Sequence, residues 1–264
     1  MSHDPTTLFL HVGDAFATIF RHAPGFAAAR TDGSWFASAG EASAIFSWLG
    51  LADASPANVA TLRDIVGRLR GRRLEGLTCY PAADETALSQ VFADLGLDVP
   101  EDVPLMVLAA ADLPPLPEMD VAVERVGSPE RLAAAMLIPA AAFDMPVEQT
   151  IRAFDAVLLE DPAIGVYTAG RNGAVVGALV LSRSADTVSI DIMAVDPAAQ
   201  RRGIGRALML GAMHAEAAAG ATGFHLLSST EGKRLYDQLG FTTLLETHVR
   251  FIPVAIIPAD QVVT

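Results

Sequence analysis

The amino-acid sequence predicts an α+β fold of three layers (α/β-type layering), in which a mixed central sheet is flanked by helices. Short apolar segments of strand length alternate with longer segments of helical periodicity, a pattern typical of this class. Two turn signals, Thr31–Ser34 and Gly170–Gly173, each separate two strand-like segments and predict hairpins. Hydrophobic residues make up 52% of the 264 residues, which is enough for a sizeable core.

The first half of the chain predicts a helix, a hairpin and then strands that alternate with helices. The apolar segment 44–51 fits either a strand or a short helix. The expected elements are helix 8–20, strands 25–30 and 35–38, the segment 44–51, helix 59–70, strand 74–80, helix 85–95 and strand 104–110.

A proline-rich stretch, residues 113–119, predicts a stiff linker between an N-terminal domain of residues 1–112 and a C-terminal domain of residues 120–264. The elements expected beyond it are strand 121–126, helices 130–138 and 147–159, strands 165–169, 174–182 and 188–195, a helix from about Ile204, strand 223–228, helix 231–239 and strand 242–252. This order nearly repeats the first half. We therefore interpret the N-terminal domain as a degenerate copy of the same fold; an unrelated α+β extension is the alternative.

Composition and charge limit the classes of partner. The formal net charge of −13 argues against a nucleic-acid-binding protein, and it favours a cationic partner only weakly, because high charge also serves solubility. No apolar run is long enough to cross a membrane, and the N-terminus lacks a signal-peptide pattern. The single cysteine, Cys79, fits a core position in a cytoplasmic protein. The histidines have no metal-ligand spacing, so we expect no metal.

The segment from Val188 to Ala219 predicts an anion site. A strand that alternates over 188–195 ends at Asp196-Pro197, and a helix with a small and apolar face begins after the glycine-rich stretch Gln200–Arg206. A helix start carries unpaired N–H groups and partial positive charge, and glycines let a phosphate approach the backbone. A dinucleotide fold would require a third glycine where Leu208 stands, and a P-loop would require Gly-Lys-Ser/Thr. A helix start that is glycine-rich for packing alone is the other alternative.

Two motifs in this half resemble a known family. Gln200-Arg201-Arg202-Gly203-Ile204-Gly205, preceded by Met193–Pro197, resembles the acyl-CoA signature Q/R-x-x-G-x-G/A of the GNAT-type N-acetyltransferases. Gly232–Phe241, with Leu235-Tyr236 and Leu239-Gly240-Phe241, resembles the closing helix of the same family. The resemblance covers about residues 120–253 and implies a GNAT-like domain. With the repeated element order, it predicts tandem GNAT-like domains, of which the second is the catalytic one.

The resemblance implies acetyl-CoA as the acyl donor and assigns residues to it. The end of the central strand would orient the pantetheine and thioester through its backbone, and the glycine-rich turn would bind the pyrophosphate. Ser229 stands seven residues before Tyr236, where the family often has asparagine, and this departure weakens the transfer of that role. The predicted contacts are Met193, Ala194, Val195, Gln200, Arg201, Arg202, Gly203, Ile204, Gly205, Arg206 and Ser229.

Two residues are predicted to be catalytic. Tyr236 matches the family tyrosine that protonates the leaving thiolate; the alternative is a core tyrosine. Asp191 is a carboxylate in a strand expected to be central, which suits a proton acceptor, although it could instead be a structural aspartate. His225 is a second candidate base that a satisfied core histidine explains as well, and many such enzymes pass the proton through water.

The acceptor is the least determined part of the site. In a GNAT-type fold the segment that contains Phe143, Asp144 and Met145 would lie over the substrate side, so these are the candidate substrate contacts; an ordinary loop is the alternative. We expect an acetyl-CoA-dependent N-acetyltransferase for a small-molecule amine, either monomeric or homodimeric. The alternatives are a protein or peptide N-acetyltransferase and a non-catalytic acyl-CoA-binding sensor.

Overall fold

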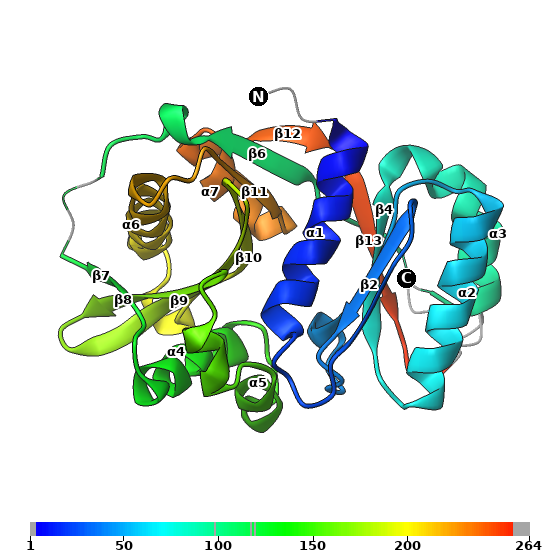
Figure 1. The fold of residues 1–264 in the computed structure, drawn as a ribbon, viewed down its shortest axis with the longest axis horizontal. Helices are drawn as coiled ribbons and strands as arrows, with labels where there is room; N and C mark the ends of the chain where they lie inside the picture. The colour runs from blue at the N-terminus through cyan, green and yellow to red at the C-terminus, as the bar shows by residue number, and fades with distance from the viewer. Residues whose placement is uncertain (1–3, 98, 117, 119, 256–264) are drawn as a thin grey trace. The chain divides into compact units, whose positions relative to one another are not determined.

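The computed structural model describes residues 4–97, 99–116, 118 and 120–255. The α+β class predicted from the sequence is confirmed: within these residues, the strands form two mixed sheets and helices pack against them (Figure 1). The backbone contacts divide the chain into two compact units. One consists of residues 106–243. The other, here called the N-terminal unit, consists of the residues up to Leu105 together with those from Leu244.

The 106–243 unit is organised on a seven-stranded sheet with the order β12-β6-β11-β10-β9-β8-β7. From β7 to β10 each strand pairs with the next in antiparallel fashion, whereas β10 and β11 are parallel. The strands are β6 (Leu105–Ala109), β7 (Ala122–Arg125), β8 (Ile164–Arg171), β9 (Ala174–Ser184), β10 (Thr187–Val195), β11 (Gly223–Leu227) and β12 (Thr242–Leu245).

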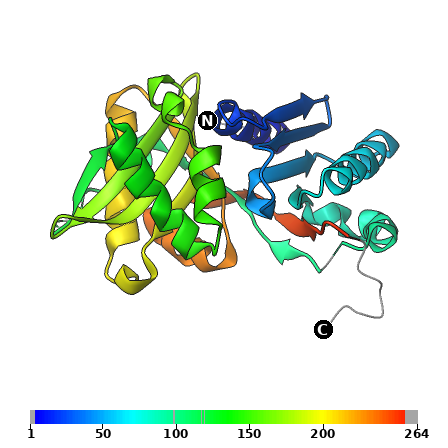
Figure 2. The same ribbon diagram turned by 90° about the horizontal axis from the view of Figure 1, so that it is seen from below.

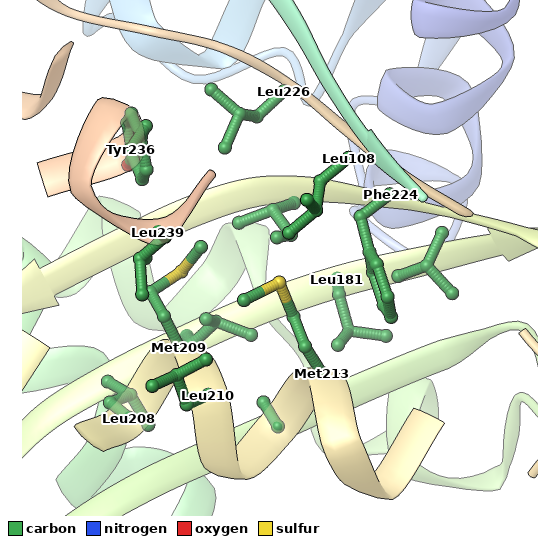
Figure 3. Close-up of a cluster of buried hydrophobic side chains, with 14 of the residues drawn as sticks. Leu108, Leu181, Leu208, Met209, Leu210, Met213, Phe224, Leu226, Tyr236 and Leu239 are labelled. Carbon is green, nitrogen blue, oxygen red and sulfur yellow. The ribbon is translucent and has the colours of Figure 1, made fainter. Parts of the chain in front are cut away.

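Helices cover both faces of this sheet. The helices are α4 (Pro129–Ala142), α5 (Val147–Ala153), α6 (Ile204–Ala218) and α7 (Thr230–Leu239). Figure 1 shows α6 and α4 on opposite sides of β8 and β9. On the α6 side, Leu208, Met209 and Met213 form a fully apolar core with Phe224 of β11 and Leu108 of β6 (Figure 3). This core fixes the start of α6 at the end of β10.

The N-terminal unit contains a six-stranded sheet with the order β1-β2-β3-β4-β13-β5. Its strands are β1 (Ala27–Arg30), β2 (Ser34–Ser38), β3 (Ser47–Leu51), β4 (Gly76–Pro81), β5 (Glu101–Asp102) and β13 (Thr247–Ile252). Its helices are α1 (Pro5–Phe20), α2 (Pro56–Gly71) and α3 (Glu85–Leu95), which Figure 2 shows from a second direction. The core joins α2 and α3 to the sheet through Leu49, Leu62, Leu88, Phe92 and Ile252. Cys79 is fully buried in β4, as expected.

In both sheets consecutive antiparallel strand pairs are followed by one parallel pair, and each sheet contains one strand from the other half of the chain. The pair β3 and β4 is parallel, like β10 and β11, and each pair is followed by a helix, α3 or α7. Next to β4 lies β13, and next to β11 lies β6. The last strand of each half of the chain thus lies in the sheet formed by the other half. Because strand pairing is non-local, no pattern within β6 or β13 could predict this exchange.

Other differences from the sequence prediction have local causes. The strand expected over 242–252 is two strands, β12 and β13, which belong to different sheets. The helix expected over 147–159 ends at Ala153, because the Asp155 carboxylate accepts the N–H of Val157 and begins a 3₁₀ helix over Ala156–Glu160. The expected linker, residues 113–119, lies inside the 106–243 unit, because β6 precedes it and pairs with β11 and β12.

Candidate active site

The parallel strands β10 and β11 diverge in the middle of their sheet. They pair only from Thr187 to Ser189, opposite Gly223 to His225, whereas β10 pairs with β9 as far as Val195. Beyond Ser189, the edge of β10 that faces β11 therefore has no strand partner among the described residues. Extended backbone with free N–H and C=O groups can hydrogen-bond an extended ligand. The predicted contacts Met193, Ala194 and Val195 all lie in this part of β10.

The turn after β10 presents backbone N–H groups. The Asp196 carboxylate accepts the N–H of Ala198, and Gln200 Nε2 donates to the carbonyl of Val195 at 3.2 Å, so Gln200 holds the turn against the strand. Arg201 and Gly203 both have left-handed backbones, with φ of 62° and 77°. Residues in this conformation next to helical ones direct successive N–H groups into a concavity that suits anions. No side chain caps α6, so its first N–H groups are left for a ligand.

The three arginines of this turn have different environments. Arg201 and Arg202 are exposed, and neither forms an ion pair or hydrogen bond with the described residues, although the chain is strongly acidic. Arg206, in contrast, donates from Nη1 to the carbonyl of Gln238 at 3.3 Å and so joins α6 to the end of α7. The side chains of Arg201 and Arg202 are therefore available to an anion, whereas Arg206 already has a structural contact.

The second glycine of the motif is not required by packing. A Cβ atom built on Gly205 would lie 3.4 Å from Leu235 and 3.6 Å from Val195, which are ordinary contacts. Glycine inside a helix is less stable than alanine by about 0.5–1 kcal/mol. The absence of a side chain at this position is therefore better explained by the close approach of a ligand than by the fold.

Tyr236 lies on α7 with its ring buried and its hydroxyl available. The ring packs against Phe241 with their centroids 5.8 Å apart, and Gly232 makes room for it, since a Cβ there would lie 2.8 Å from the ring. The hydroxyl makes no hydrogen bond with the described residues. Burial raises the pKa of Tyr236 to about 12, so the group stays protonated at neutral pH and can act as a proton donor.

Asp191 lies at a β-bulge of β10. The register against β9 shifts between Ile190 and Ile192, so Asp191 is an extra residue. The strict alternation expected over 188–195 is therefore wrong: Val188 and Ile190 pack in the α6 core, but so do Met193 and Val195. Ser189 Oγ donates to Asp191 Oδ1 at 2.6 Å, while Oδ2 is buried without a hydrogen-bond partner among the described residues. Burial raises the pKa of Asp191 to about 7.

The remaining predicted site residues differ in their burial and in the contacts that they make. Ser229 is the N-cap of α7, and its hydroxyl accepts the N–H of Gly232 at 3.1 Å, so it has a structural role whether or not it also binds a ligand. Phe143, Asp144 and Met145 form the turn between α4 and α5. Phe143 is 44% exposed and Asp144 has a positive φ, whereas Met145 is buried and offers little surface to a substrate. His225 is buried in β11.

The equivalent helix start in the N-terminal unit is closed by its own side chains. Ser55 caps α2 by accepting the N–H of Asn58, and the Asp53 carboxylate accepts the N–H of Ser55 at 2.9 Å and the Asn58 amide at 2.7 Å. The Asp53 carboxylate therefore lies at this helix start, where its negative charge disfavours a bound anion. Phe92 of α3 has no hydroxyl where Tyr236 stands in α7. The uncapped helix start and the tyrosine hydroxyl are thus features of the 106–243 unit that the equivalent positions of the N-terminal unit lack.

The described residues contain neither a candidate metal cluster nor a helix that could span a membrane. No group of three or more histidine, cysteine, aspartate or glutamate side chains among them could hold a metal ion. No helix in the described part of the chain combines the length and apolar character needed to cross a membrane.

Comparison with known proteins agrees with the geometry. Residues 162–243, from just before β8 into β12, match the acetyltransferase (GNAT) domain family. A GCN5-related N-acetyltransferase from Kribbella flavida superposes with a TM-score of 0.67 at 18% identity, covering 92% of this chain and 95% of its own. Another from Sphaerobacter thermophilus superposes with a TM-score of 0.58 at 15% identity, covering 83% and 80%. No curated protein matches the chain.

The structural matches extend over nearly the whole chain, so they include the N-terminal unit as well as the matched domain. Together with the repeated sheet order, they support the prediction of tandem GNAT-like domains in part. At these identities the superpositions show the fold alone, and the chemistry has to be argued from the residues of this chain.

Proposed function

We propose that this chain, in which residues 162–243 are a GNAT acetyltransferase domain, transfers the acetyl group of acetyl-CoA to a small-molecule amine. The observation that carries the proposal is the uncapped start of α6 beside the open edge of β10. A nucleotide diphosphate needs N–H donors and positive charge, and a pantetheine arm needs extended backbone to pair with. In this chain the turn that carries the N–H donors and arginines directly follows the extended backbone of β10.

The residues of this site can be assigned to two parts of acetyl-CoA, the pyrophosphate and the pantetheine arm. The N–H groups of Gly203, Ile204 and Gly205 would bind the pyrophosphate, and Arg201 and Arg202 would add full charges beside it. The backbone of Met193 and Val195 would pair with the pantetheine and hold the thioester. Because these contacts use main chain, they depend on the divergence of β10 from β11 and on the bulge, more than on the identity of side chains.

The proposed reaction is direct attack of the amine on the thioester. A protonated amine first loses a proton to Asp191, directly or through one water, and its lone pair then attacks the carbonyl carbon. When the C–S bond breaks, the Tyr236 hydroxyl gives its proton to the departing thiolate. The second proton of the amine nitrogen is lost as the amide forms and restores Tyr236. Asp191 releases its proton to solvent, so one amide, one thiol and one proton result.

Substitution of Tyr236 by phenylalanine tests the general acid. We expect kcat to fall by about 100-fold, since positioned proton transfer contributes about 10²–10⁴-fold, while the Kd for acetyl-CoA stays nearly constant. Tyr167→Phe is the matched control, because it removes a buried hydroxyl that bonds Glu216 and lies outside the site. Steady-state kinetics of both variants are the measurement. A wild-type kcat for Tyr236→Phe would make Tyr236 structural.

Direct binding and turnover test the function as a whole. Calorimetric titration of the full chain with acetyl-CoA should give a Kd on the order of micromolar. Thiol release would then be followed with spermidine, tryptamine, glucosamine and a peptide with a free N-terminus. Turnover with one of the small amines alone supports the proposal, and turnover with the peptide alone would move the acceptor to proteins. Binding without turnover would favour an acyl-CoA sensor, and a folded chain that does not bind would end the proposal.

A further inference from the structure

Buried polar residues are aligned across the centre of the seven-stranded sheet. In the strand register, Ser182 of β9 lies opposite Ser189 of β10, and Ser189 lies opposite His225 of β11. All three side chains are 3–4% exposed. Directly opposed residues share a face of a sheet, and their neighbours Leu181, Val188 and Phe224 pack in the α6 core, so this row lies on the other face. Buried hydroxyls are costly unless they have partners, and a row of them therefore requires an explanation.

Asp191 follows Ser189 by two residues in β10, so its side chain lies on the same face of the sheet as this row. The Ser189 hydroxyl donates to Oδ1 at 2.6 Å, a short distance typical of a hydrogen bond to a charged acceptor. Asp191 Oδ2 and Ser182 Oγ are both buried and make no hydrogen bond with the described residues. One oxygen of the carboxyl is thus fixed, and the other keeps its capacity to accept a proton.

Among the described residues, no positively charged side chain forms an ion pair with Asp191. Helix α4 packs against β9 and β10, and its buried residues carry no titratable side chain. The groups that face the carboxyl from the strands are Ser182, Ser189 and, one position further, His225. Burial raises the pKa of Asp191 to about 7, and the hydroxyls of Ser189 and Ser182 and the backbone of Ser182 oppose that rise. Ser182 Oγ makes no hydrogen bond with the described residues, so the Ser189 hydroxyl is the one that the structure shows bonded to the carboxyl.

We propose that Ser189 is the positioning residue of the acetyltransfer site, holding Oδ1 of Asp191 so that Oδ2 receives the proton of the acceptor amine. This inference rests on the proposed function for its chemical meaning. The dependence of the Asp191 pKa on the Ser189 hydroxyl can be tested independently of that function. No role for Ser189 could be predicted from the sequence, because a serine two residues before an aspartate in a strand does not by itself indicate a hydrogen bond between the two side chains.

The test follows the titration of Asp191 in the full chain by NMR of ¹³C-labelled aspartate carboxyl groups. The Asp191 signal is the one missing from Asp191→Asn. We expect Ser189→Ala to raise the pKa of Asp191 by about one to two pH units, because a hydrogen bond to a charged group is lost. Ser189→Thr keeps the hydroxyl and should restore the wild-type titration. Ser47→Ala removes a buried, hydrogen-bonded serine of the N-terminal unit and should leave the Asp191 signal unchanged.

Activity provides the second readout once an acceptor from the amine panel is in hand. The acidic limb of the kcat/KM profile should move to higher pH in Ser189→Ala by the same amount, with the rate recovering at alkaline pH. An unchanged carboxyl titration in Ser189→Ala would overturn the positioning role, even if the chain acetylates amines. A shifted titration with an unshifted rate profile would overturn the role of Asp191 as the base. If the chain did not bind acetyl-CoA, the proposed function would be wrong. The NMR titration would still show whether the pKa of Asp191 depends on Ser189.

Discussion

Gly205→Glu is expected to weaken acetyl-CoA binding by at least about 100-fold, because it places a side chain and a negative charge where the pyrophosphate would meet the start of α6. A like charge against a bound anion costs several kcal/mol, and every 1.4 kcal/mol is tenfold in Kd. Titration calorimetry of the full chain measures the loss. The fold should survive, since Gly205 is only half-buried in the first turn of α6 and the nearest neighbour of an added Cβ is the flexible end of Leu235.

Gly205→Ala is the matched control for this substitution. Its added methyl group would meet Leu235 at 3.4 Å, and alanine favours the helix, so we expect unchanged or slightly higher thermal stability. The family signature also allows alanine at this position. Affinity for acetyl-CoA should therefore change far less than in Gly205→Glu. Wild-type affinity in Gly205→Glu, with circular dichroism showing a folded protein, would remove the pyrophosphate from this turn.

Local chemistry explains why much of this site could be predicted from the sequence. The strand that ends at Asp196-Pro197, the left-handed Gly203 and the helix that begins at Ile204 each depend on residues a few positions apart. The same holds for Ser229 at the start of α7, and for Gly240, which ends α7 with a positive φ. These elements were found where propensity, capping and turn chemistry agree.

The features that sequence analysis missed depend on distant or irregular pairing. The bulge at Asp191 arises from the register against β9, and the contact of Arg206 with Gln238 arises from the packing of two helices. The segment 242–252 has the composition of one long strand, and nothing in it indicates that its two ends belong to different sheets. A proline-rich stretch also predicts a domain boundary by composition, although the contacts of β6 place the division before it.

Removal of β6 is expected to prevent the 106–243 unit from folding. Strand β6 lies between β11 and β12, and its Met106 and Leu108 are buried in the α6 core together with Phe224 and Leu226 (Figure 3). Loss of two such side chains costs about 4–10 kcal/mol, since truncation of each buried leucine or methionine costs about 2–5 kcal/mol. A domain has only about 5–15 kcal/mol of stability, and the unpaired edges of β11 and β12 would add to the loss.

Two fragments that differ in residues 104–117, the segment that contains β6, give the comparison. The fragment 104–245 keeps β6 and should unfold in a single cooperative thermal transition, whereas the fragment 118–245 should show no such transition and should aggregate. Circular dichroism melts and size-exclusion chromatography measure both properties. The proline-rich stretch alone would have led to the shorter fragment as the independent domain. A cooperative melt of 118–245 at the Tm of the longer fragment would mean that β6 is dispensable and that the boundary lies at residues 113–119 after all.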